Sequence, residues 1–381
     1  MRAIRSAVAL FCATAIVLLP AVPASADEVR DGQWHLRYLK VNEAHKLTQG
    51  QGVTVAVLDT GVERHPDLRK NLLAGKNFSS SSSALDGRKD DDGHGTAMAG
   101  LVAAHGRGGQ QGSLGIAPRA KILPVRNGDL LGEGNAPDSE IDDATAEGLA
   151  WAVAKGADVI SISSTGGSSP RLREAVALAI ESDVIVVAGV GNRPMHSLIG
   201  FPALIEGVVA VGATDRNGNH AEVSVTGKEL DLVAPGVDVL APTKGGQYSG
   251  GTGTSNSTAI VSGAAALVRS RFPDLSAEEV VHRLTYTAVD KGAPGRDEEY
   301  GYGVLDLMAA LTADVPPLEA SPTPSSSANP SPSTGGVASP EDDPAGGSSG
   351  LRTTLAVLAV AGLGIVFLVF GYRRHRKKLA P

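Results

Sequence analysis

The sequence predicts an α/β fold in which a mainly parallel sheet lies between two layers of helices. Short apolar runs rich in β-formers alternate with helix-like segments along residues 53–311, which is typical of strand–helix–strand units. The runs are continuously apolar, as in strands that are buried on both faces. They are residues 53–58, 121–125, 158–162, 183–188 and 207–213. We therefore expect one three-layer domain over residues 53–312.

Helix signals stand between these strands. Pro170 is placed for the first turn of a helix, and Ser276 with Glu279 forms a capping box for another. His94 and Ser255 each begin an alanine-rich helical pattern. Because functional groups gather at the carboxyl ends of parallel strands, the residues that follow the strands are the candidates for a site.

The two ends of the chain carry signals for export and for a membrane. Residues 1–26 show a basic, then an apolar, then a small-residue region, which is the order of a cleaved secretory signal. Residues 353–372 are 20 uncharged, mainly apolar residues, about 30 Å as a helix, which matches a bilayer core. The basic residues of the tail 373–381 predict a cytoplasmic C-terminus.

The remaining segments complete a single-pass arrangement at the cell membrane. Residues 27–52 form an N-terminal arm, and residues 313–352, rich in proline, serine and glycine, form a disordered linker. The folded domain is therefore expected outside the cytoplasm. The net charge of −7 gives no basic excess for nucleic acid, which we exclude as a partner. The single cysteine, Cys12, lies in the signal, so the mature chain has no disulfide.

Four residues supply the groups that activate a serine hydroxyl. Asp59 follows a buried strand, and His94 and Ser255 begin helices. An imidazole takes the proton of the hydroxyl, and a carboxylate fixes the imidazole tautomer. Asn192 follows another strand, where its amide and the Ser255 backbone N–H can stabilise an oxyanion.

The order and spacing of these motifs resemble those of the subtilisin-like serine peptidases. The motifs are VAVLDTGV around Asp59, DGHGTAMAG around His94, VVAGVGNRP around Asn192 and GTGTSNSTAIVSGAAAL around Ser255. With its signal, arm, linker, span and tail, the chain is most similar to the mycosins, membrane-anchored subtilases associated with type VII secretion. The resemblance implies a subtilisin-like fold, a serine endopeptidase that forms an acyl-enzyme, a protein or peptide substrate, and type VII secretion membrane components as partners.

The resemblance also places the primary specificity pocket. It implies one wall at Ser163, Ser164 and Thr165, and a facing wall at Ala188, Gly189 and Val190, although simple strand packing also explains the second segment. Thr165 stands near a position that is usually glycine in this family, so we expect a narrower pocket.

Three residues after the nucleophile depart from the family pattern. Asn256 and Ser257 replace an apolar and a small residue, and Ala259 replaces a proline. Alanine is tolerated in the first turn of a helix. The two polar residues are expected to make the surroundings of Ser255 more polar and to alter turnover. The alternative function is therefore a catalytically weak or inactive scaffold of a secretion assembly.

Metal and aspartic-protease chemistry are disfavoured. An oxygen-rich cluster of the kind that can hold calcium is formed by Asp86, Asp90, Asp91 and Asp92. No glutamate follows at the spacing of a calcium-binding loop, so we interpret the cluster as a solvated acidic loop. We expect no metal and no cofactor. Asp59-Thr60-Gly61 also fits an aspartic protease, but no second Asp-Thr-Gly or Asp-Ser-Gly segment is present.

Overall fold

The computed structural model describes residues 26–80, 85–128 and 138–318. Most of the predicted signal (residues 1–25 of 1–26) and most of the predicted linker (residues 319–352 of 313–352) lie outside the described residues. The predicted span 353–372 and tail 373–381 lie outside them entirely. Within the described ranges, no helix combines the length and the apolar character needed to cross a membrane.

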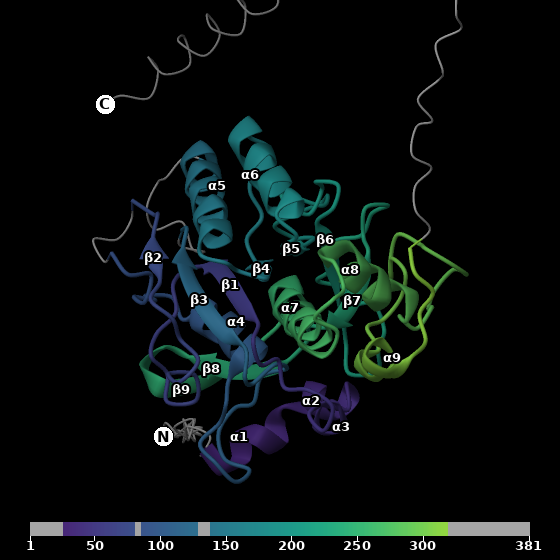
Figure 1. The fold of residues 1–381 in the computed structure, drawn as a ribbon, viewed down its shortest axis with the longest axis horizontal. Coiled ribbons are helices and arrows are strands. Elements are labelled where there is room, and N and C mark those ends of the chain that lie inside the picture. Colours follow the sequence, from purple (N-terminus) through teal and green to yellow (C-terminus); the bar gives the residue numbers. More distant parts are fainter. Residues whose placement is uncertain (1–25, 81–84, 129–137, 319–381) are drawn as a thin grey trace, which may run out of the picture. The chain divides into compact units, whose positions relative to one another are not determined.

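The centre of the described chain is a parallel sheet of seven strands in the order β2-β3-β1-β4-β5-β6-β7 (Figure 1). The strands are β1 Thr54–Asp59, β2 Lys76–Asn77, β3 Lys121–Arg126, β4 Val159–Ile162, β5 Ile185–Gly189, β6 Val209–Thr214 and β7 Leu232–Pro235. All five predicted strands are confirmed, with ends within two residues of the prediction. The sequence analysis missed β2 and β7, which are the short strands at the two edges.

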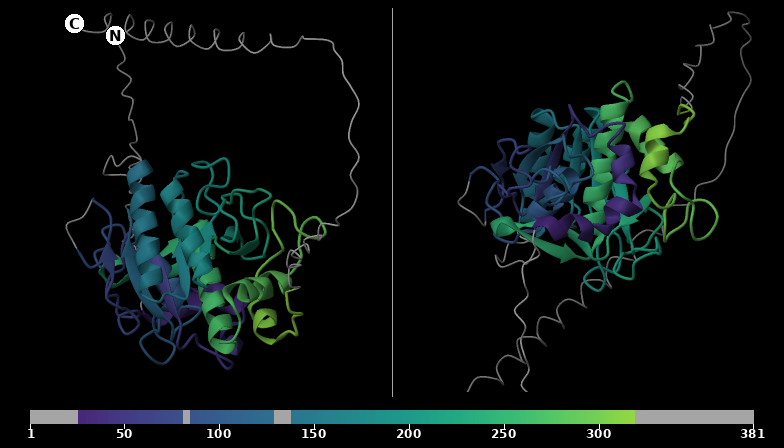
Figure 2. Two further views of the ribbon diagram at one scale, coloured as in Figure 1. Left: turned by 45° about the horizontal axis from the view of Figure 1, so that its top comes forward. Right: turned by 90° about the horizontal axis from the view of Figure 1, so that it is seen from below.

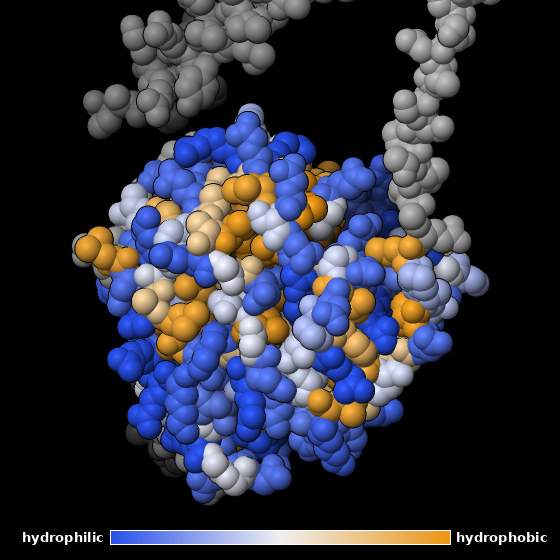
Figure 3. All heavy atoms as spheres, in the orientation of Figure 1, coloured by the Kyte–Doolittle hydropathy of each residue, from blue (hydrophilic) through white to orange (hydrophobic). Residues whose placement is uncertain are grey.

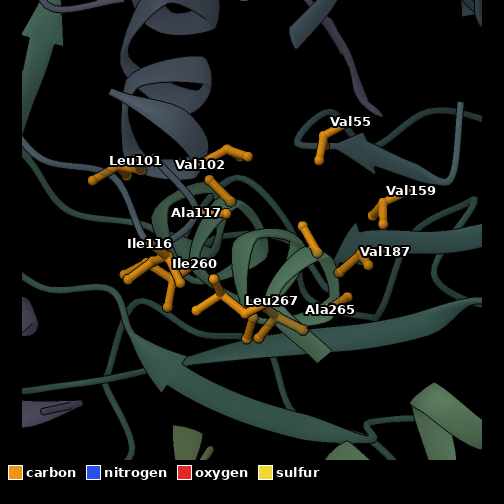
Figure 4. Close-up of a cluster of buried hydrophobic side chains, with 14 of the residues drawn as sticks. Val55, Leu101, Val102, Ile116, Ala117, Val159, Val187, Ile260, Ala265 and Leu267 are labelled. Carbon is orange, nitrogen blue, oxygen red and sulfur yellow. The ribbon is translucent and has the colours of Figure 1, made fainter. Parts of the chain in front are cut away.

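Helices cover both faces of the sheet, as predicted. Residues of β1 alternate between the faces: Val55 and Val57 pack toward α4 and α7, whereas Ala56 and Leu58 pack toward α5 and α6. Figures 1 and 2 show α5 and α6 side by side, and Figure 4 shows the apolar cluster around α7. The helices are α4 His94–Ala103, α5 Asp138–Ala154, α6 Pro170–Glu181, α7 Thr254–Arg271, α8 Ala277–Tyr286 and α9 Leu307–Thr312.

The predicted helix starts are confirmed in detail. Pro170 occupies the first turn of α6, where a missing N–H costs nothing, and the preceding Ser169 caps the helix. Ser276 and Glu279 form the reciprocal capping box of α8, with distances of 2.7 Å and 3.2 Å. Local sequence therefore determines where these helices begin.

The N-terminal arm packs into the core of the domain. It forms α1 Ala26–Gly32, α2 Trp34–Tyr38 and α3 Val41–Ala44, and several of its apolar side chains belong to the larger core cluster. The Trp34 indole donates to the carbonyls of Val237 and Asp238, at 3.2 Å and 3.1 Å. These carbonyls precede an antiparallel hairpin, β8 Val239–Thr243 and β9 Gln247–Gly251. The arm and the domain therefore share one core.

A buried histidine in the arm makes stability depend on pH. His35 is fully buried, and neither ring nitrogen has a hydrogen-bond partner in the described structure. Burial and, secondarily, the charge of Arg37 lower the pKa of His35 to about 3. Its unfolded pKa is about 6.5, so the unfolded chain takes up the proton first and stability is lost as the pH falls from 6.5 toward 3.

We expect His35 to lower the free energy of unfolding by about 2 kcal/mol when the pH falls from 7.5 to 5. Urea unfolding of the wild type and of His35→Leu at both pH values measures this. The wild type should lose about 2 kcal/mol more than the variant between the two pH values. Other titrating groups are common to both proteins, so an equal loss in the two would contradict the prediction.

The face shown in Figure 3 is mainly hydrophilic, with hydrophobic residues in separate groups. The exposed apolar side chains of the described residues include two in the loop that follows β5, Met195 and Leu198, which are 75% and 77% exposed. This loop therefore presents apolar groups to solvent close to the carboxyl edge of the sheet.

Candidate active site

The candidate residues meet at the carboxyl ends of three neighbouring strands. Asp59 is the last residue of β1, Ser163 directly follows β4, and Asn192 lies three residues after β5. These strands are adjacent in the order β1-β4-β5. His94 is the first residue of α4, and Ser255 is the second residue of α7. The topology therefore gathers residues that are up to 196 positions apart in the chain, from Asp59 to Ser255.

Asp59 and His94 form the carboxylate–imidazole pair that the sequence predicts. The Nδ1 atom of His94 lies 2.7 Å from Oδ1 of Asp59. The same carboxylate oxygen accepts the backbone N–H of Thr60 at 2.8 Å. A proton shared with the carboxylate on Nδ1 leaves Nε2 as the basic nitrogen.

The electrostatic surroundings favour the protonated form of His94. Burial by itself lowers the pKa of His94, and only 20% of the side chain is exposed. The charge of Asp59 and its hydrogen bond raise the pKa, and together with nearby carboxylates they outweigh the effect of burial. Asp92 and Asp90 add smaller effects of the same sign. The pKa of His94 therefore lies above its ordinary value of 6.5.

Asp90 is a buried acceptor that joins the two motifs, which corrects the solvated-loop interpretation for this residue, whereas Asp86 and Asp91 are exposed as expected. Only 2% of Asp90 is exposed. Its Oδ1 accepts from the Thr60 hydroxyl and the Gly93 N–H, at 2.8 Å and 2.7 Å. Its Oδ2 accepts from the N–H and hydroxyl of Thr96, at 2.8 Å and 2.6 Å. Asp90 thereby fixes the start of α4 against the end of β1.

The glycine after His94 permits this close approach. A Cβ atom at Gly95 would lie 2.1 Å from the carbonyl oxygen of Gly61 and 3.1 Å from the Cβ of Asp59. The Gly95 N–H donates to the Thr60 hydroxyl at 3.0 Å. A side chain at position 95 would therefore push His94 away from Asp59.

The Ser255 hydroxyl is half-buried and lies beside the first predicted wall. It donates to the carbonyl oxygen of Ser163 at 3.2 Å. Within the described residues, the Ser255 hydroxyl makes this hydrogen bond and none to the His94 ring. The predicted role of Ser255 as nucleophile would require rotation of the hydroxyl toward Nε2 of His94, since a catalytic hydrogen bond often forms only with substrate bound.

Asn192 is oriented by its contacts with α7. Its Oδ1 accepts the backbone N–H of Thr254 at 2.9 Å and the Thr254 hydroxyl at 3.2 Å. Because the carbonyl end of the amide is held in this way, the Nδ2 end remains to donate. The Ser255 N–H lies in the first turn of α7, where backbone N–H groups have no acceptor within the helix. Both groups predicted to bind an oxyanion are thus found at the start of α7.

Asn256 and Ser257 point away from the nucleophile, contrary to the expectation that they make its surroundings more polar. The Asn256 amide donates to the carbonyls of Gly236 and Gly251, at 3.1 Å and 3.0 Å. The Ser257 hydroxyl donates to the Ala234 carbonyl at 2.8 Å. These groups donate to backbone carbonyls in β7, directly after β7 and at the end of β9.

The two predicted pocket walls differ in what they present. Ser163, Ser164 and Thr165 are all half-buried, so their side chains or carbonyls can face a ligand. Ala188 and Val190 are fully buried in the apolar cluster beside α5 and α6. Their side chains therefore form core, and only their backbone is available to line a pocket. Gly189 faces α7, because a Cβ there would lie 3.1 Å from the hydroxyls of Thr254 and Thr258.

Sequence reasoning missed His196, which lies between these walls. Its Nε2 atom is 2.8 Å from the Thr165 hydroxyl, and its Nδ1 atom accepts the Asn192 backbone N–H at 3.1 Å. The only signal in the sequence was its position four residues after Asn192.

Comparison with known proteins places the chain in a family. The subtilase family matches residues 50–303. Subtilisin Savinase from Lederbergia lenta is 38% identical over 281 residues, which are 73% of this chain and 97% of the relative. A thermostable alkaline protease from Halalkalibacterium halodurans is 36% identical over 275 residues, 71% of each chain.

Solved structures of mycosins are also similar. MycP1 from Mycobacterium smegmatis has 29% identity and a TM-score of 0.66, over 76% of this chain and 89% of that one. The MycP3 protease from the type VII (ESX-3) secretion system has 30% identity and a TM-score of 0.65, over 78% of this chain and 91% of that one. The chain therefore belongs to the subtilase family of serine endopeptidases, and its structural neighbours include the mycosins.

Proposed function

We propose that this chain is a membrane-anchored extracytoplasmic endopeptidase in which Asp59, His94, Ser255 and Asn192 perform the chemistry. The observation that carries the proposal is the 2.7 Å contact between His94 and Asp59, next to a helix start that presents Ser255. The Asn192 amide, held by Thr254, supports a role in binding the oxyanion.

The residues act in two half-reactions. The Ser255 hydroxyl attacks the substrate carbonyl while Nε2 of His94 takes its proton, and Asp59 stabilises the imidazolium. Asn192 and the Ser255 N–H bind the oxyanion of the tetrahedral intermediate. His94 then protonates the leaving amine, which leaves an acyl ester on Ser255. A water molecule, deprotonated by His94, attacks the ester and releases the acid.

A fluorophosphonate probe tests this assignment on the full chain purified in detergent. The wild type should be labelled and Ser255→Ala should not. Asn256→Ala removes a neighbouring polar side chain that faces away from the site, and it should still be labelled. A folded wild type that stays unlabelled would favour the alternative, a catalytically weak or inactive scaffold. The backbone contacts of Asn256 and Ser257 argue against that alternative, because neither residue disturbs the nucleophile.

The pH profile of activity is expected to follow the raised pKa of His94. A general base must be neutral, so a pKa above 6.5 moves the acid-side loss of kcat/KM to a pH above 6.5. Removing the Asp92 charge with Asp92→Asn should move this midpoint to lower pH without breaking the contact with Asp59. The neighbouring Asp91→Asn is the control, since Asp91 is not among the charges that shift His94. A midpoint below 6.5 in the wild type would contradict the assignment.

The membrane topology follows from the sequence outside the described residues. The apolar segment 353–372 and the basic tail 373–381 predict one span with a cytoplasmic C-terminus. Protease added to intact cells should therefore release a soluble domain by cutting within the linker, at residues 316–350. Protection of the domain until the cells are lysed would contradict this topology.

A role in type VII secretion is supported by the likeness to MycP1 and MycP3. Crosslinking of the anchored chain in membranes should then capture membrane components of such a system. The inactive Ser255→Ala chain should be captured as well, because assembly requires the fold and not the nucleophile.

A further inference from the structure

His196 connects the two segments that flank the nucleophile. It lies in the loop between β5 and β6, and its Nε2 atom is 2.8 Å from the hydroxyl of Thr165, in the segment after β4. Its Nδ1 atom lies 3.1 Å from the backbone nitrogen of Asn192, and its own N–H donates to the Asn192 carbonyl at 2.9 Å. The ring therefore spans the space between the two segments.

The hydrogen bonds define the state of this ring. Nδ1 accepts from a backbone N–H, so it carries no proton. In a neutral imidazole the proton is then on Nε2, which donates to the Thr165 hydroxyl. Both nitrogens are occupied by the protein, and neither is left for a substrate group.

The two ends of this connection lie in segments that both contact the start of α7. Thr165 is two residues from Ser163, whose carbonyl accepts the Ser255 hydroxyl. Asn192 holds the residue before Ser255 through its amide. With Ser255 as the proposed nucleophile, the side chain of the substrate residue whose carbonyl is attacked is expected to enter between these two segments, as the predicted pocket walls imply. The bond between His196 Nε2 and the Thr165 hydroxyl joins the same two segments.

Close packing leaves the pair little room to move aside. A Cβ atom at Gly200 would lie 2.9 Å from the Thr165 Cβ, and one at Gly191 would lie 3.2 Å from three atoms of His196. The nearby Arg193 guanidinium donates to the Ser224 carbonyl and to the Thr226 hydroxyl, at 3.0 Å for the latter. Two nitrogens of the guanidinium are thus already paired within the protein.

We propose that His196 and Thr165 form a bridge across the primary specificity pocket and restrict it to small, uncharged side chains such as alanine. The proposal rests on the proposed function, because Ser255 and Asn192 define where the pocket lies. The bridge excludes large side chains by volume. It disfavours charged ones because both His196 nitrogens are already paired within the protein, and a buried charge without a partner is costly.

Peptide p-nitroanilides that differ only in the residue before the scissile bond test the bridge, using the full chain in detergent. The wild type should hydrolyse the alanine substrate with a kcat/KM at least about tenfold above that of the phenylalanine substrate. Thr165→Gly removes one half of the bridge and should raise the phenylalanine-to-alanine ratio by about tenfold or more. Thr165→Ser keeps the hydroxyl and its bond to His196, so its ratio should stay close to that of the wild type.

His196→Ala gives a second, independent variant. It also removes the acceptor of the Asn192 N–H, so kcat should fall for both substrates while the ratio rises as in Thr165→Gly. This variant decides the question if Thr165→Gly does not fold. A wild type that prefers phenylalanine, or a ratio unchanged in the folded variants, would overturn the bridge. A wild type that is neither labelled by fluorophosphonate nor active would instead overturn the proposed function.

Discussion

Replacing His94 by alanine is expected to lower kcat about as much as replacing Ser255 by alanine, and the double variant should be no slower than either. The physical reason is that the hydroxyl attacks only while the imidazole takes its proton, so each residue is without effect when the other is missing. In a subtilisin, a member of the same family, either loss lowers kcat by about 10⁶, and we expect a similar magnitude here.

Steady-state hydrolysis of an alanine peptide by the three variants measures this coupling, with circular dichroism as the control for folding. The residual activity should be the same in all three, because oxyanion binding and substrate positioning remain. If the double variant were slower by the product of the two single effects, His94 and Ser255 would act independently and the proposed base would be wrong.

Replacing Asn192 by alanine should lower kcat by about 10²–10³ and leave KM nearly unchanged. The amide donor stabilises charge that exists only on the attacked oxygen, so it contributes to the transition state and little to substrate binding. The magnitude is that known for the oxyanion asparagine of a subtilisin. The backbone N–H of Ser255 remains, which is why some activity should persist.

Asn256→Ala is the matched control for this experiment. It also removes a buried amide in the first turn of α7, but that amide donates to the carbonyls of Gly236 and Gly251. We expect Asn256→Ala to lose about 1–3 kcal/mol of stability and to keep kcat. Equal kcat losses in the two variants would show that Asn192 acts by supporting the fold. An unchanged kcat in Asn192→Ala would show that another group binds the oxyanion.

The sheet and the helix starts were predictable because their signals are local. Strands buried on both faces consist of apolar residues without interruption, as at residues 183–188, and Pro170 and Ser276 mark helix starts through the backbone N–H groups that each helix leaves unpaired. The positions of Asp59 and Asn192 follow from the same reasoning, since a residue after a parallel strand lies at the carboxyl edge of the sheet.

What the sequence could not reveal depends on contacts between distant segments. Asp90 looked like part of an exposed acidic run, but two threonines, one 30 residues before it, satisfy its oxygens. His196 bonds to a residue 31 positions away, and Trp34 to carbonyls more than 200 positions away. The short strand β9, with the sequence QYSGG, has too few apolar residues to give a periodic signal.

The directions of Asn256 and Ser257 bear on how active and inactive relatives are told apart. Both residues differ from those usual in the family after the nucleophile. Their side chains nevertheless donate hydrogen bonds to the backbone carbonyls of Gly236 and Ala234. A motif search based on residue identity alone would classify this chain as an inactive relative. A search that scores only the residues of this helix turn whose side chains face the substrate would classify it as active. Such a search would identify a pseudoenzyme only from substitutions at those residues.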